Sequence, residues 1–176
     1  MDSSRRRGYP KDKCSISELN FGTNYKIDCI RDGDVAWTEN IDNLVVNTGL
    51  EYAMGCVFGT VPKKELVLGL CIDSSVSPTD TAESHQFVEF LGTTNNNRPS
   101  VEFSDGGLVG DKYTYVAANT QAMITTSGTI TGVFMTDWKI KGEDKGMLYG
   151  VASFSASKAV VPGDALLITV TVSAKG

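Results

Sequence analysis

The sequence predicts a mainly β protein: a β-sandwich, jelly-roll or immunoglobulin-like, with one short α-helix and an extended N-terminal arm. Apolar and polar residues alternate in about ten short runs separated by turn-forming residues, which is the pattern of a sandwich. The 18 glycines, together with many Thr and Val residues, also favour strands joined by tight turns. The hydrophobic period lengthens from two to about 3.6 residues in only one stretch, residues 43–60. We expect residues 1–20 to form the arm and residues 21–176 one sandwich domain.

The first strands are predicted from alternation on both sides of a turn. Tyr25, Ile27 and Cys29 share one face of a strand, and Asp32-Gly33 supplies the positive φ angles of a two-residue hairpin turn. Residues 35–38 form the returning strand. We expect residues 39–42 to be a linker.

The stretch 43–60 predicts a short buried strand at 44–46, followed by the helix. Thr48 and Glu51 have the spacing of a capping box, in which each side chain accepts a backbone N–H of the other residue. Gly59 is typical of a helix C-terminus. One apolar face follows at helical spacing, so we expect the helix to plug or cover the β body; this face comprises Leu50, Ala53, Met54, Val57 and Phe58.

The middle of the chain mixes a buried strand with loops. The continuous apolar run 66–72 predicts a central strand that is buried on both faces and packed against the helix. Residues 79–85 predict a helical turn, and residues 87–91 a strand. Residues 92–99 predict a surface loop whose asparagine amides form turns or bind a ligand.

From Val101 the pattern is β throughout. We expect a turn at 105–107, a strand at 113–117 with its tyrosines on one face, and a charged loop at 139–146. A strand at 147–154 carries Gly150 as a bulge, residues 155–158 link it to the next turn, and the last strand alternates most clearly. The inward residues of that last strand are Leu166, Ile168, Val170 and Val172.

Charge is distributed unevenly along the chain. Residues 1–14 carry +3, and because the whole chain carries −5, the remainder carries −8. A basic arm on an acidic body predicts self-association or contact with an acidic neighbour, although a solvated terminus has the same composition. Nucleic-acid binding is disfavoured, because no aromatic residues alternate with the basic ones. The candidate partner-binding residues are Arg5, Arg6, Arg7, Lys11 and Lys13.

The residues give no indication of catalysis, cofactor binding or membrane contact. His85 is the only histidine, and the four cysteines stand singly, against the paired spacing of zinc sites. No run approaches the roughly 20 apolar residues of a membrane span, and no apolar segment follows the basic start as in a signal peptide. We expect a non-enzyme that folds in a cytoplasm, with free thiols. Three of these thiols are expected to be buried: Cys29, Cys56 and Cys71.

Three stretches, taken in order, resemble small virion structural proteins of tailed bacteriophages, of the head-decoration, head-fibre or tail-fibre type. They are residues 34–37 with 43–50, residues 97–99 with 129–135, and residues 146–154 with 163–170. The resemblance spans roughly residues 33–173. It implies a non-enzymatic virion protein, assembled in the host cytoplasm, whose partner is the major capsid protein or another virion protein. A homo-oligomer is the general expectation.

We therefore expect a capsid decoration or cement protein that is attached partly through its basic arm. A tail-associated or fibre protein is the first alternative. The second is a host-surface or glycan-binding module that uses the loop 95–98 with Tyr113 and Tyr115.

Overall fold

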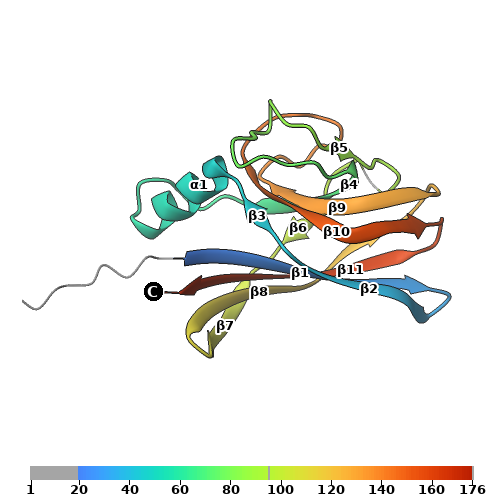
Figure 1. The fold of residues 1–176 in the computed structure, drawn as a ribbon, viewed down its shortest axis with the longest axis horizontal. Helices are drawn as coiled ribbons and strands as arrows, with labels where there is room; N and C mark the ends of the chain where they lie inside the picture. Colours follow the sequence, from blue (N-terminus) through green and yellow to red (C-terminus); the bar gives the residue numbers. More distant parts are fainter. Residues whose placement is uncertain (1–19, 95, 176) are drawn as a thin grey trace, which may run out of the picture.

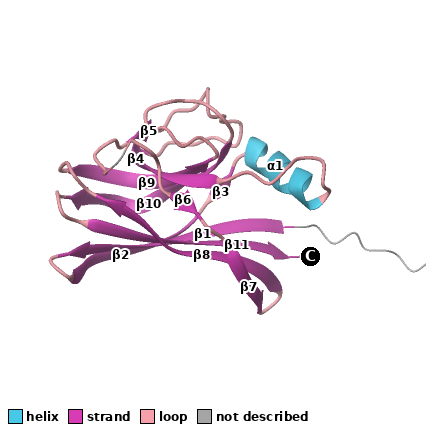
Figure 2. Cartoon of the chain, turned by 180° about the vertical axis from the view of Figure 1, so that it is seen from behind, coloured by secondary structure: helices cyan, strands magenta, loops and turns pink. Residues whose placement is uncertain are grey.

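The computed structural model describes residues 20–94 and 96–175, and it confirms the mainly β class with two antiparallel sheets and one short helix (Figures 1 and 2). Sheet A has the strand order β2-β1-β11-β8-β7. Sheet B has the order β3-β10-β9-β4-β5, with β6 also paired to β4. The elements are β1 (Asn20–Arg31), β2 (Asp34–Asp42), β3 (Leu44–Val45), α1 (Asn47–Val57), β4 (Leu66–Asp73), β5 (Val88–Glu89), β6 (Ser100–Val101), β7 (Ser104–Val109), β8 (Lys112–Met123), β9 (Gly128–Thr136), β10 (Leu148–Val160) and β11 (Ala165–Lys175).

The strand pairing joins distant parts of the chain. The β9–β10 hairpin in sheet B is nested inside the β8–β11 pair in sheet A. The first described strand, β1, pairs along its length with the last, β11. In a constant-type immunoglobulin sandwich the first and last strands lie in different sheets, so the order found here departs from that alternative.

The predicted hairpin between β1 and β2 is confirmed. Asp32 and Gly33 have φ angles of 53° and 91°, as a two-residue turn of this hand requires. The expected linker at 39–42 is wrong, because β2 continues to Asp42.

Glu39 in this stretch is buried. It accepts the Ser155 N–H at 2.7 Å and a hydrogen bond from the Lys158 ammonium at 2.8 Å. Burial by itself raises the pKa of Glu39, but the hydrogen bonds from Lys158 and Ser155 have the larger combined effect and lower it to about 2. Glu39 thereby ties β2 to β10 at one side of the sandwich.

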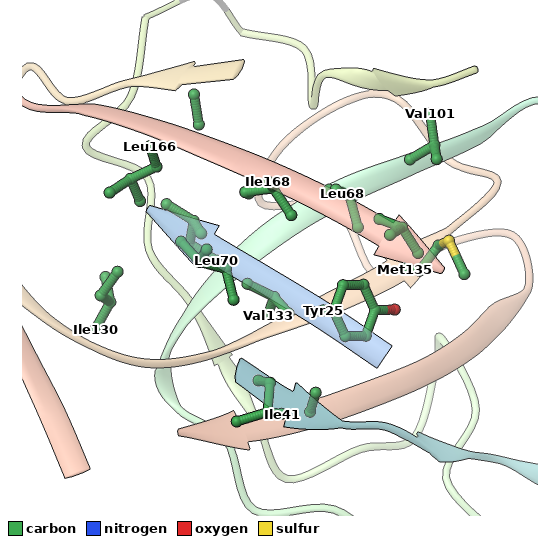
Figure 3. Close-up of a cluster of buried hydrophobic side chains, with 14 of the residues drawn as sticks. Tyr25, Ile41, Leu68, Leu70, Val101, Ile130, Val133, Met135, Leu166 and Ile168 are labelled. Carbon is green, nitrogen blue, oxygen red and sulfur yellow. The ribbon is translucent and has the colours of Figure 1, made fainter. Parts of the chain in front are cut away.

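The core lies between the sheets, where alternate residues of each strand point inward (Figure 3). Leu166, Ile168 and Val170 on β11 are fully buried, as their alternation predicts. The prediction that residues 66–72 are buried on both faces is confirmed from Leu66 to Cys71. Loops before β5 cover the outer face of sheet B. There a second apolar cluster forms, whose largest members are Phe87, Phe134, Leu148 and Val151.

Helix α1 forms where the period predicts it, but the predicted capping box is wrong. The N-cap is Val46, without a side-chain cap. Thr48 lies in the first turn, and its hydroxyl donates to the Leu148 carbonyl of β10 at 2.7 Å. A partner from the tertiary structure has therefore replaced the local one.

The predicted helix end at Gly59 is confirmed. Gly59 has a φ of 69°, and its N–H donates to the Cys56 carbonyl at 3.2 Å. The N–H of Thr60 donates to the Gly55 carbonyl at 2.8 Å. These two bonds form a Schellman motif.

The helix does not cover the sandwich with its apolar face, contrary to expectation. It contacts β10, where a Cβ at Gly49 would collide with the backbone of Tyr149. Tyr52 and Ala53 reach the core, whereas Val57 and Phe58 are 60% and 71% exposed. The expected packing of β4 against the helix is thus replaced by packing against β10.

Other differences lie at turns. Residues 79–85 form bends without a helix, and the predicted strand at 87–91 shrinks to β5. The glycines at 105–107 belong to β7, and the turn moves to Gly110. Residues 155–158 continue β10 as strand, and the predicted bulge at Gly150 is confirmed by a register shift.

No helix in the described ranges is long and apolar enough to cross a membrane.

Two of the three predicted buried thiols are confirmed. Cys29 and Cys71 are fully buried and free, whereas Cys56 is free but half-buried on α1. Cys14 lies outside the described residues. Burial raises the pKa of Cys29 to about 11 and that of Cys71 well above its usual range.

Replacing Thr48 with Val should lower the free energy of unfolding by about 0.5–1.5 kcal/mol, because the Leu148 carbonyl loses its donor. Replacing the exposed Glu51 with Ala should leave it unchanged within error. Urea denaturation of both variants measures the difference. A capping box would be supported instead if the two losses were equal.

Alkylation of the native protein should modify Cys56 before Cys29 and Cys71, because the latter two thiols are buried and remain protonated near neutral pH. Mass spectrometry of a time course in iodoacetamide gives the order. In denaturant the three should react at similar rates. Early native labelling of Cys71 would contradict the burial of β4.

Candidate functional site

The five predicted partner-binding cations, Arg5, Arg6, Arg7, Lys11 and Lys13, lie outside the described residues. The structure therefore neither places them nor brings them together. The residues of the glycan-binding alternative are described, with the exception of Asn95.

The loop 92–99 is held by a buried ion pair. Arg98, which is 5% exposed, donates from Nε and Nη2 to the two carboxylate oxygens of Glu89 at 2.9 and 2.8 Å. Its Nη1 donates to the Trp138 carbonyl at 2.7 Å, and the guanidinium lies 5.0 Å from the centre of the Phe134 ring. Because these contacts engage the guanidinium inside the protein, Arg98 does not present it to a sugar.

His85 also has a structural environment. Its ring stacks on Phe87 with 3.7 Å between the ring centres, and its Nδ1 lies 3.0 Å from the Phe87 carbonyl oxygen. Its Nε2 is 3.2 Å from Asp144. Within residues 20–94 and 96–175, no group of three or more His, Cys, Asp or Glu side chains is placed to hold a metal ion.

The candidate site is instead the end of the molecule that carries α1, which we call the helix end. Figures 1 and 2 show α1, the start of β1, the end of β11 and the β7–β8 hairpin at the same end of the long axis. Sheet A extends past sheet B here. Ala117 of β8 is buried in the core, and Tyr115 and Tyr113, two and four residues earlier on the same face, are 49% and 44% exposed.

Strand register continues this uncovered face across sheet A. Tyr113 is paired with Ala174 of β11 and with Leu108 of β7, and Ala174 is paired with Phe21 of β1. Paired residues point to the same side of a sheet. An apolar row therefore crosses four strands, and Leu108 at its end is 71% exposed.

A hollow of about 390 Å³ lies between the α1 side and the segment before β7. Tyr52 forms part of its wall, and the Tyr52 hydroxyl accepts the Lys64 N–H at 2.8 Å. Phe103 and Val101 supply apolar lining. Four exposed residues supply two charges of each sign: Lys63, Lys64, Glu65 and Glu102. The hollow is thus a surface of mixed apolar and charged character, which suits a side chain of a protein partner.

Sequence reasoning found the components of this site but not their exposure. The apolar face of α1 and the tyrosine face of β8 were both predicted. Leu108 and Val109 were missed, because the glycines before them were interpreted as a turn. The apolar pair Leu108 and Val109, followed by the turn-forming residues Gly110-Asp111, is the signal that could have indicated a hairpin.

Comparison of the chain with protein-family models, with curated proteins and with solved structures found no match.

Replacing Arg98 with Ala should lower the free energy of unfolding by about 3–5 kcal/mol, because it leaves the Glu89 carboxylate buried without its partner. Replacing Arg98 with Lys should restore only part of this lost free energy of unfolding, since an ammonium group cannot form the bidentate pair. As a control, Lys145→Ala removes the exposed pair with Glu143 and should cost less than about 1 kcal/mol. Equal small losses in thermal denaturation for both sites would show that Arg98 is not buried in solution.

Proposed function

We propose that this chain is a non-enzymatic structural protein of a bacteriophage particle, a capsid decoration or cement protein, that works by protein–protein contact. The observation that carries the proposal is the helix end, where large apolar side chains of α1 and the β7–β8 hairpin stand exposed on a two-sheet body. Exposed apolar patches of this kind mark protein interaction surfaces.

The resemblance to small phage virion proteins supports the same class. In this chain its stretches coincide with β2, β3 and the start of α1, with Arg98 and β9, and with β10 and β11. These elements build the core of the sandwich and the buried Arg98–Glu89 pair. The resemblance therefore bears on a shared scaffold, and the choice of capsid over tail is part of the proposal.

The uneven charge supports separate roles for the arm, which would attach the protein, and the sandwich, which would form its rigid body. The arm carries the dense positive charge, and the body is acidic. An arm that binds an acidic surface of the capsid shell gives attachment, while the sandwich supplies a rigid body outside it. A tail or fibre protein would use the same two parts on a different partner.

The glycan-binding alternative retains the exposed pair Tyr113 and Tyr115, whose rings lie 5.8 Å apart. It loses Arg98, and the Tyr113 hydroxyl is engaged by Asp105 at 2.8 Å. The alternative is therefore weaker than protein docking.

Deleting residues 1–14 should weaken binding to particles that lack the protein, while the melting temperature of the body changes little. Replacing Arg5, Arg6 and Arg7 with Ser should weaken binding in the same direction. The difference from wild type should narrow as salt rises, because the screening length falls to ~8 Å near physiological ionic strength. Co-sedimentation with particles across a salt series measures this.

The matched control replaces the exposed Lys26 and Lys145 of the sandwich with Ser, which changes net charge in the same direction. Binding by this control should stay near wild type. Quantitative gels of purified particles then separate the locations: hundreds of copies for a decoration protein, a handful for a tail protein. Tight binding of the deletion variant at every salt concentration would contradict attachment through the arm.

A further inference from the structure

We infer that the helix end of one copy binds the helix end of a second copy, so that the protein is a dimer through this surface. This inference deepens the proposed function by naming the partner of the exposed surface. It leaves the basic arm as the part that contacts another protein.

The first argument is the unpartnered face of α1. An 11-residue helix is marginal on its own in water and depends on tertiary packing of its apolar face. Among residues 20–94 and 96–175, packing covers only the side of α1 around Gly49, Tyr52 and Ala53. Val57 and Phe58 at the C-terminal end face solvent, next to a Schellman turn that holds them in place.

The second argument is the uncovered face of sheet A at the same end. Tyr113, Tyr115 and Leu108 point to the side on which the core lies, beyond the reach of sheet B. The face of a sheet that continues a core is normally covered by another layer. No other element among the described residues covers these three side chains, since they remain 44–71% exposed.

The third argument is area. Taking ~150–250 Å² for a whole aromatic side chain, the exposed parts of Phe58, Tyr113 and Tyr115 amount to roughly 250–400 Å². This alone equals the largest patch of many monomers. Four exposed aliphatic side chains extend it toward the ~800 Å² that each partner buries in a standard interface. They are Leu50, Val57, Val61 and Leu108.

The fourth argument is self-complementarity. The surface has two apolar projections, the end of α1 and the tip of the β7–β8 hairpin, together with the 390 Å³ hollow lined by Tyr52 and Phe103. A two-fold axis presents a projection of each copy to the hollow of the other, which is the condition for an isologous contact.

The exposed charges around this surface also permit self-association. Four exposed lysines, Lys63, Lys64, Lys112 and Lys175, stand here against five exposed carboxylates, Glu51, Glu65, Glu102, Asp105 and Asp111. The net charge of each end is therefore small, and two such ends repel each other only weakly. The rest of the surface carries the net negative charge of the chain, which disfavours contact elsewhere.

Sedimentation velocity of the full chain over a dilution series tests this. We expect a species of twice 18.9 kDa that dissociates on dilution. Val57→Ser and Leu108→Ser should each weaken dimerisation about tenfold or more, as for central apolar contacts of an interface. Far-UV circular dichroism should be unchanged, because both side chains are exposed in the monomer.

The matched controls are Val35→Ser and Leu91→Ser. Val35 is 58% exposed against 60% for Val57, and Leu91 is 57% exposed against 71% for Leu108. Val35 lies next to the β1–β2 turn, at the opposite end of the long axis (Figure 1). Both controls should dimerise like wild type.

Three results would overturn the inference. One is a monomer at every concentration, and another is equal weakening by the controls, which places the contact elsewhere. The third is a monomer that dimerises only after deletion of residues 1–14, which shows that the chain's own N-terminal segment covers the helix end. The outcome is independent of the particle-binding test, so a dimer that does not enter particles would refute the proposed function alone.

Discussion

Sheet A is longer than the surface that sheet B covers, and the rest of the molecule follows from this mismatch. Where the two sheets overlap, alternating side chains of β1, β8 and β11 are fully buried. Where sheet A continues alone, the same alternation carries Tyr113 and Tyr115 out of the core. Helix α1 sits at this end but is fixed to β10, so it does not close the gap. Because sheet A extends past sheet B, the alternation that fills the core in one part of β8 exposes Tyr113 and Tyr115 in another.

The outer face of sheet B, in contrast to the exposed end of sheet A, is covered by other parts of the chain. There the loops around β5 and residues 137–146 cover the sheet, and one buried charge pair holds them. Arg98 joins Glu89 to the carbonyls of Trp138 and Glu143 while lying against Phe134. A buried pair of this kind adds little stability by itself, but it fixes one arrangement of loops that have few apolar residues of their own. The loop 92–99 is thus specified by a partner nine residues away in the sequence.

Local chemistry explains which expectations were confirmed. The Asp32-Gly33 turn, the Gly59 helix end and the alternation of β11 depend on neighbouring residues, and each was predicted from the sequence. The capping box failed because Thr48 found a carbonyl of β10, one hundred residues away. Arg98 was predicted to lie in a surface loop, because the sequence does not show that it forms a buried ion pair with Glu89. The exposure of the α1 face could not be predicted, because it depends on where sheet B ends.

The pairing of β1 with β11 also governs when the protein can fold. Sheet A needs a strand from each end of the described chain, and β11 lies between β1 and β8. During synthesis, at roughly 5–20 residues per second, β1 and β8 therefore lack their shared neighbour until β11 leaves the ribosome. In that interval β1 can pair only with β2, and its inner residues, among them Tyr25 and Ile27, lack their neighbours on β11. The nascent chain is then at its most vulnerable to aggregation, and chaperone demand should peak just before β11 emerges.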